Sequence, residues 1–213
     1  MLGGSDGVIE CVAMTAALNG ALIQSSTILI AGVAFSVAGG VSMFFSNYLS
    51  RKSEIDALKM DVERERMEIE TEPEEERSEL VELLSKEGYT ESEVNVIMSR
   101  LMKDKEMWLR AQLMHELKLH VDDLETDPLG RSASAGAAFM LAAFIALAPY
   151  ATGVPLPQAF VGSIVLSVLT LFVLGSKAFT LKAFSLKGGF ESAILGVVAA
   201  VSLYLIGHLI SLL

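Results

Sequence analysis

Cysteine is almost absent from this sequence, and the absence excludes several classes of site. Cys11 is the single cysteine among 213 residues, which rules out an internal disulfide and any cysteine-rich zinc or iron–sulfur centre. Aromatic residues make up only 7% of the chain and no basic face accompanies them, which argues against nucleic acid as a partner. No basic segment followed by a cleavage site opens the sequence, so we expect no removable signal peptide.

Charge is present but segregated along the chain. Hydrophobic residues make up 52% and the mean hydropathy is +0.51, yet the net charge is −10. These values are compatible because most charged residues lie within 51–128, whereas long stretches on either side carry almost none. We therefore predict an all-α membrane protein with two membrane helices in 1–50, an acidic helical insert in 51–128 and three membrane helices in 129–213.

Four segments are long enough to cross a bilayer core, which needs about 20 apolar residues in a helix. They lie at about 27–48, 133–152, 158–177 and 191–213. A fifth segment, at about 5–24, is weaker because the chain starts almost at its acids, Asp6 and Glu10. Either this helix is shallow or residues precede Met1. With it included, we predict five membrane helices.

Basic residues accompany only alternate connections between these segments. The uncharged connections are NGALIQSS and TGVPLPQ, and the basic residues of the others are Arg51, Lys52, Arg131, Lys177, Lys182 and Lys187. Because basic loops stay in the cytosol, we predict a cytosolic N-terminus, insert and lysine-containing loop, and a C-terminus outside.

Small residues recur at four-residue spacing in the second segment, at Gly32, Ser36 and Gly40. Such spacing lets helix backbones approach closely. The pattern fits packing inside one bundle and a dimer seam equally well.

The insert continues the second segment. Ile55, Leu58, Val62 and Ile69 follow a three/four spacing, so one apolar stripe is expected to run out of the membrane until Pro73 interrupts it. Further helices follow, and several residues predict where they begin and end. Gly88 is expected to end one helix, Thr90 and Glu93 to form a capping box, and Asp104 to cap a last helix over 105–121. Asp127–Gly130 is expected to form a turn back to the bilayer.

One acidic residue interrupts the apolar stripe. Glu65 stands where an apolar residue is expected, Glu68 follows three residues later, and Glu76 and Glu79 repeat this spacing after Pro73. A glutamate-rich helix is ordinarily a solvated surface. Carboxylates beside an apolar seam are desolvated and repel one another unless a cation lies between them. The pattern therefore favours a site for a hard or borderline divalent metal.

The last helix of the insert adds three residues at four-residue spacing, Gln112, Glu116 and His120. The set suggests ligands without specifying them, since a lone histidine on such a helix is more often a surface residue. No Glu-x-x-His pair occurs, which argues against a di-iron oxidase.

Three residues of the membrane segments are candidate metal ligands: Asp6, Glu10 and Met43. An aspartate at the bilayer centre costs roughly 2.5–3.5 kcal/mol, so it usually has a function. The alternative for both acids is an interfacial position near the start of a helix. Met43 offers a soft, weak ligand, but methionine also fills helix cores.

Several short motifs follow one another along the chain: Gly4-Ser5-Asp6-Gly7, Ala38-Gly39-Gly40-Val41-Ser42-Met43, Tyr48-Leu49, Ser53-Glu54, the glutamates Glu65, Glu68, Glu76 and Glu79 around Pro73, and Trp108 eight residues before Glu116. In this order, the motifs resemble the vacuolar iron transporter family over nearly the whole chain.

The resemblance implies a fold and a function. It implies five membrane helices, a homodimer with the metal pathway at its interface, and a cytosolic metal-binding insert. Asp6 and Met43 are then expected to line the pathway, and the metal ligands of the insert to be Glu65, Glu68, Glu76, Glu79 and Glu116. Transport in the family is coupled to a proton that moves in the opposite direction.

The sequence departs from the family pattern at two positions. Gln112 replaces a metal-binding methionine, and an amide oxygen is a harder ligand than a thioether. Phe35 replaces an acid early in the second segment, and Glu10, one helical turn from Asp6, could supply that charge from the neighbouring helix.

We therefore expect a transporter and not an enzyme, without a prosthetic group, that exports Fe²⁺, or Mn²⁺, from the cytosol by metal/proton antiport. No G-x-x-x-x-G-K-[ST] motif is present, so the driving force is expected to be a gradient. The alternatives are a membrane-anchored metal buffer or sensor and, with less support, a membrane ferroxidase. The compact chain favours a prokaryotic plasma membrane.

Overall fold

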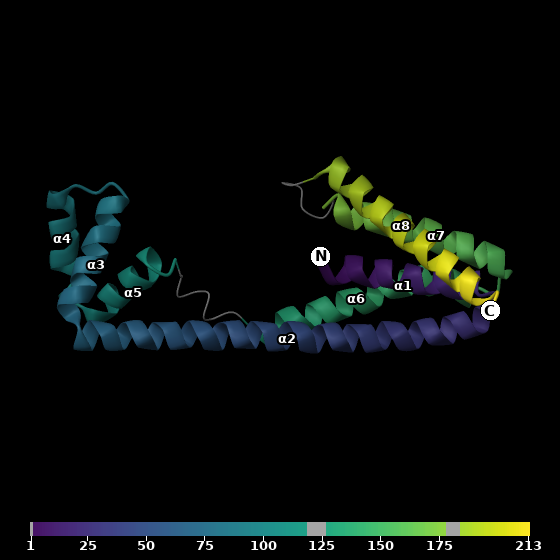
Figure 1. Ribbon diagram of the computed structural model, residues 1–213, viewed down its shortest axis with the longest axis horizontal. Helices are drawn as coiled ribbons and strands as arrows, with labels where there is room; N and C mark the ends of the chain where they lie inside the picture. Colours follow the sequence, from purple (N-terminus) through teal and green to yellow (C-terminus); the bar gives the residue numbers. More distant parts are fainter. Residues whose placement is uncertain (1, 119–126, 178–183) are drawn as a thin grey trace. The chain divides into compact units, whose positions relative to one another are not determined.

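The computed structural model describes residues 2–118, 127–177 and 184–213, and every regular element in these ranges is a helix (Figure 1). The helices are α1 (Leu2–Gly20), α2 (Ser25–Thr71), α3 (Pro73–Lys86), α4 (Glu91–Leu101), α5 (Lys105–His115), α6 (Pro128–Ala151), α7 (Leu156–Gly175) and α8 (Leu186–Ile210). They form two compact units. The membrane unit comprises Met1–Tyr48 and Leu129–Leu213, and the insert unit comprises Leu49–Pro128.

Four helices are long and apolar enough to cross a membrane: α2, α6, α7 and α8. They coincide with the four strong segments of the sequence, and they make the protein an integral, multi-pass membrane protein. Helix α1 is not among them, because its 19 residues include polar side chains such as Asp6, Glu10 and Asn19.

Helix α1 is nevertheless buried within the membrane unit. Val8, Cys11 and Ala16 are fully buried and belong to apolar clusters formed with α6, α7 and α8. Glycines allow the close contacts. A Cβ atom at Gly7 would lie 2.3 Å from the Phe139 carbonyl oxygen of α6, and one at Gly207 of α8 would lie 1.9 Å from that of Ala17. Small residues therefore let α1 pack directly against neighbouring backbones.

The small residues of α2 pack inside the chain, which decides between the two interpretations that the sequence left open. A Cβ atom at Gly32 would lie 2.3 Å from Leu147, and one at Gly40 would lie 2.3 Å from Met140, both in α6. Ser36 is fully buried and donates a hydrogen bond to the Gly32 carbonyl oxygen at 2.7 Å. Another face of α2 is exposed in the single chain, at Ile30, Val33, Val37, Val41 and Phe45.

The insert unit forms its own core, as the apolar stripe predicts. Helix α2 runs without interruption from the second membrane segment to Thr71, where Pro73 begins α3. Ile69 of α2 packs with residues of α3, α4 and α5: Leu80, Leu84, Val94, Met98, Trp108, Leu109, Ala111 and Leu113. A continuous helix therefore carries the predicted ligands Glu65 and Glu68 to this small core.

Most of the predicted helix caps and ends in the insert are confirmed. Gly88, with φ +101°, follows α3. Thr90 and Glu93 form the capping box of α4. Asp104 caps α5 by accepting hydrogen bonds from the backbone N–H groups of Glu106 and Met107.

Two boundaries differ from the prediction. The last helix of the insert ends at His115 rather than near residue 121, with Glu116 as its C-cap. Asp127–Gly130 is not a turn, because Pro128 begins α6. Proline at the first helical position loses no hydrogen bond and has a suitable φ, so it initiates this helix. His120 and Lys182 lie outside the described residues, and Lys187 lies within α8.

Candidate metal centre

Three glutamates from three helices of the insert unit converge. Glu65 of α2, Glu76 of α3 and Glu116 at the end of α5 each place a carboxylate oxygen within 4.8 Å of the others. Glu65 is only 1% exposed and Glu76 is 6% exposed. We call these three residues the carboxylate cluster. Its oxygen atoms are the ligand type that hard and borderline divalent cations bind.

The local sequence explains how each carboxylate reaches the cluster. Glu65 occupies the predicted vacancy in the apolar stripe of α2, so it points into the core of the insert. Pro73 ends α2 and starts α3, which places Glu76 in the first turn of the new helix. Glu116 is the C-cap of α5, where the negative end of the helix dipole disfavours an anion. A cation in the cluster would relieve that repulsion.

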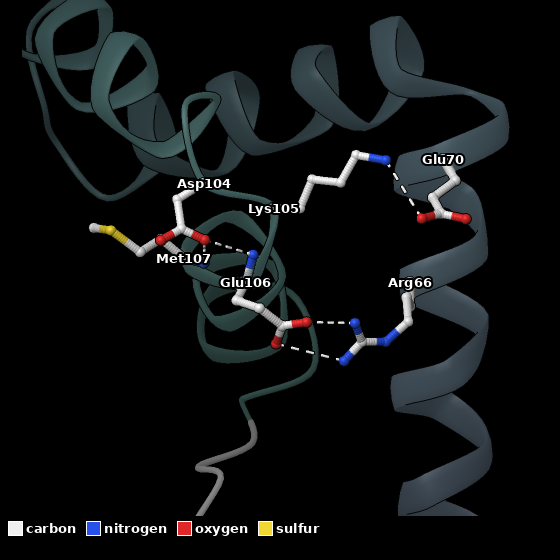
Figure 2. A network of polar contacts seen from close by, with 6 residues as sticks. All are labelled: Arg66, Glu70, Asp104, Lys105, Glu106 and Met107. Atoms are coloured by element: carbon white, nitrogen blue, oxygen red, sulfur yellow. Dashed lines mark hydrogen bonds and ion pairs between the residues drawn. The ribbon is translucent and has the colours of Figure 1, made fainter.

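Exposed polar contacts hold the start of α5 against α2 (Figure 2). The Arg66 guanidinium donates to both carboxylate oxygens of Glu106, and the Lys105 ammonium lies 3.3 Å from a Glu70 oxygen. Asp104 caps the same turn. These contacts lie at the start of α5, whereas Gln112 and Glu116 lie at its other end.

Gln112 forms part of the wall of the cluster and is fully buried. Its side-chain nitrogen donates to the Glu76 carboxylate at 2.7 Å, with a longer contact of 3.5 Å to the Glu76 carbonyl oxygen. Among the described residues, three buried oxygens here have no hydrogen-bond partner: Glu65 Oε2, Gln112 Oε1 and Glu116 Oε2. Buried polar atoms are nearly always partnered, so these oxygens are free acceptors for a cation.

Burial and mutual repulsion disfavour the charged forms of these carboxylates. Burial, followed by the charges of Glu65, Glu68 and Glu79, raises the pKa of Glu76 to about 7. Burial also raises the pKa of Glu116 to about 7, with Glu65 and Glu79 as the next causes. Burial raises the pKa of Glu65 as well, although the hydrogen bond from Arg64 opposes the rise. Without a bound metal ion, Glu76 and Glu116 therefore take up protons near neutral pH.

Arg64 is a cation at the edge of the cluster that the sequence reasoning missed. Its guanidinium lies 3.4 Å from Glu65 Oε1 and 3.7 Å from a Glu68 oxygen. Its side chain is 52% exposed. The sequence does place Arg64 directly before Glu65, which could have suggested an ion pair. Helical periodicity alone, however, places neighbouring residues on different faces.

The other predicted residues of the insert do not join the three converging carboxylates. Glu68 and Glu79 lie at the rim, where they act on Glu76 and Glu116 through their charge.

The predicted membrane residues lie in the other unit. The Met43 sulfur packs beside α1, where a Cβ atom at Gly3 would lie 2.8 Å from it. Gly3 is about one helical turn from Asp6, so the Met43 thioether of α2 packs beside α1 about one turn before Asp6. Asp6 is partly exposed and Glu10 is exposed in the single chain. Phe35 packs against Phe139, with ring centroids 6.4 Å apart.

The sequence matches the VIT family over residues 1–208. "Vacuolar iron transporter 1" of Arabidopsis thaliana is 32% identical over 211 residues, which cover 99% of this chain and 84% of the relative. "Vacuolar iron transporter 1" of Eucalyptus grandis is 30% identical over 205 residues, covering 96% and 82%. "Vacuolar iron transporter" of Toxoplasma gondii is 31% identical over 183 residues, covering 82% and 61%. These relatives are named as transporters, not enzymes, and the chain belongs to the VIT family.

Proposed function

We propose that this protein is a secondary transporter that exports Fe²⁺, with Mn²⁺ as a second cargo, from the cytosol in exchange for protons. One observation carries the proposal. Three carboxylates, two of them from buried residues, converge beside three unpartnered buried oxygens in a chain that also has helices long and apolar enough to cross a membrane. Its relatives are named vacuolar iron transporters, which supports iron as the cargo.

In this proposal α1 is the fifth membrane helix and carries the pathway carboxylate. Polar residues lower its hydropathy, but its burial among α6, α7 and α8 supports a place inside the bundle. Asp6 binds either a metal ion or a proton, since one carboxylate oxygen does not hold both at once. That exclusion couples the two ions. Met43 adds a soft ligand that disfavours Ca²⁺ and Mg²⁺, and Glu10 supplies a second charge near Asp6.

The proposed assembly is a homodimer with the pathway at its interface. Glu10 is exposed in the single chain, and an apolar face of α2 that includes Ile30, Val37 and Phe45 is exposed as well. An acid on the surface of a membrane bundle is unfavourable against lipid, so a second copy that covers Glu10 would stabilise the protein.

In the proposed topology the insert lies in the cytosol, because basic residues flank it. The carboxylate cluster, with Gln112 in its wall and Glu68 and Glu79 at its rim, would collect metal before it enters the membrane. The relatives' names refer to a vacuole, so they give no support to the expected prokaryotic plasma membrane. In either membrane the direction of transport is out of the cytosol.

A second candidate function is a membrane-anchored metal buffer. It is favoured by one observation: the carboxylate cluster is complete within the insert unit. Deletion of residues 54–125 separates the two functions. A transporter should retain part of its metal flux without the insert, whereas a buffer should lose all metal binding.

Flux in proteoliposomes tests the leading proposal. Metal entry and internal pH are followed with two dyes while Fe²⁺ or Mn²⁺ is added outside. Asp6→Asn should abolish metal-dependent proton movement, whereas the matched control Asp56→Asn, an exposed acid of the insert, should leave it intact. Normal coupled flux in Asp6→Asn would refute the mechanism.

A further inference from the structure

One guanidinium lies across the side of the carboxylate cluster that belongs to α2. Arg64 contacts Glu65 at 3.4 Å, Glu68 at 3.7 Å and Asp61 at 3.8 Å. These acids lie one residue after, four after and three before it, so a single side chain reaches along one side of the helix. Among the described residues, no other cation is ion-paired with Glu65, Glu68, Glu76, Glu79 or Glu116.

The two carboxylate oxygens of Glu65 have different surroundings. Its Oε1 accepts a hydrogen bond from Arg64, whereas its Oε2 is buried and has no partner. The carboxylate itself is 1% exposed, but the arginine side chain that touches it is 52% exposed. Arg64 therefore reaches from solvent to a buried ligand, and its long stem lets it return to solvent without disturbing the core.

We propose that Arg64 is a built-in counter-ion of the metal site, which holds Glu65 and Glu68 while the site is empty and is displaced when a divalent cation enters. The inference rests on the proposed function, since it requires that the insert binds metal. A metal ion that approaches the cluster meets a positive charge at its edge and must replace it at Glu65. Arg64 therefore lowers the affinity of the site and favours release of the ion.

The chain offers a matched control two residues away. Arg66 lies on the same helix, its side chain is 44% exposed and it also pairs with a glutamate. Its partner, however, is Glu106 at the start of α5, and not a residue of the cluster (Figure 2). Arg64→Gln and Arg66→Gln make the same change of net charge on the same helix. They differ in whether the lost charge contacts the metal ligands.

The experiment measures Mn²⁺ binding to the full chain in detergent at low ionic strength and about pH 8, where free carboxylates are ionised. The electron paramagnetic resonance signal of free Mn²⁺ reports the unbound ion, and the part of the binding that Glu65→Gln removes belongs to the insert. Arg64→Gln should tighten this binding about three- to tenfold, because an exposed unit charge acts modestly on a neighbour and a divalent ion doubles the effect. Arg66→Gln should change it less than twofold, and Arg64→Lys should bind close to the unmodified chain.

The dependence on salt distinguishes a counter-ion from a structural role. The gain in Arg64→Gln should shrink as salt is raised from about 0.01 M to about 0.5 M, because screening weakens interactions between exposed charges. Unchanged or weaker binding in Arg64→Gln would overturn the inference, as would an equal gain in Arg66→Gln. If the unmodified chain shows no Mn²⁺ binding that Glu65→Gln removes, the proposed role of the insert fails instead.

Discussion

The insert unit and the membrane unit both hold acidic residues among apolar ones, but these acids differ in how deeply they are buried. In the insert, Glu65 and Glu76 are buried and face a third carboxylate from another helix of the same unit. In the membrane unit, Asp6 is partly exposed and Glu10 is exposed.

The difference indicates where each site is completed. The insert brings three carboxylates together within one chain, because three short helices fold onto the end of α2. Asp6 and Glu10 lie one helical turn apart on α1 and neither is buried in the single chain, so under the proposed function the membrane site would be covered by a second copy. Metal binding should therefore be separable from metal transport.

The largest effect is expected when the carboxylate cluster of the insert is disrupted. We expect Glu65→Gln with Glu76→Gln to weaken Mn²⁺ binding by the insert about 100-fold or more, because two of the three converging carboxylates lose their charge. Flux at low metal should fall with it, whereas flux at saturating metal should persist through the membrane site. Binding titrations and proteoliposome flux on the same preparation measure both.

The matched control is Glu63→Gln with Glu74→Gln. These exposed acids lie on the same two helices, and their replacement makes the same change of charge. An equal loss of binding in the control pair would mean that the insert attracts metal by diffuse charge and not by a defined cluster.

The second effect is on pH, and its sign follows from the raised pKa values. Glu76 and Glu116 have pKa values of about 7, so they bind protons below neutral pH and must release them when a metal binds. We expect Mn²⁺ affinity of the insert to fall by about tenfold or more from pH 8 to pH 6, since up to two protons compete with each ion. Isothermal titration in two buffers of different protonation enthalpy measures the released protons.

The same shifts predict how stability of the metal-free insert changes with pH. Both carboxyls have pKa values near 7 when folded, against an ordinary value of 4.5. The folded state therefore binds more protons than the unfolded state between about pH 4.5 and pH 7, and stability falls as pH rises through that window. Melting curves that follow Trp108 should show this decline. A rise in stability over the same window would contradict the burial of these groups.

The third effect concerns metal choice in the insert. Gln112 presents an amide to an otherwise all-carboxylate cluster, and its Oε1 has no partner. We expect Gln112→Met to shift the ratio of Mn²⁺ to Cd²⁺ affinity about tenfold toward Cd²⁺, because a thioether is a softer ligand. Gln112→Glu keeps an oxygen ligand, so it should preserve the preference for Mn²⁺. Competition between the two metals in one titration gives the ratio directly.

Features that depend on one helix could be predicted from the sequence. The vacancy in the apolar stripe identified Glu65 as buried, since periodicity alone decides which face of α2 meets the core. The caps at Thr90 and Asp104 depend on a few adjacent residues and were predicted for the same reason.

Features that depend on how helices pack could not be predicted in the same way. Five glutamates were candidate ligands, but the angle between α2 and α3 and the end of α5 decide that Glu116 converges while Glu68 and Glu79 remain at the rim. The small residues of α2 were compatible with two kinds of partner, and only the contact with α6 identifies one. Arg64 was overlooked because its flexible side chain bends toward Glu65, which no periodicity describes.

The smallest effect separates two ways of fixing α5 in the insert, a cap and an ion pair. The Asp104 side chain accepts two backbone N–H groups that otherwise lack a helical partner, so Asp104→Ala should destabilise the insert by about 1 kcal/mol. The Arg66–Glu106 pair is exposed on both sides, so Arg66→Ala should destabilise the insert less than Asp104→Ala does. Urea unfolding followed by Trp108 fluorescence compares the two variants.

The same two variants test what positions the carboxylate cluster. If α5 is held mainly by its buried contacts with α3 and α4, neither variant should change Mn²⁺ affinity by more than about twofold, because Gln112 and Glu116 lie beyond the altered turn. A large loss of affinity in Arg66→Ala alone would mean that the exposed pair, rather than the core around Trp108, sets the position of the cluster.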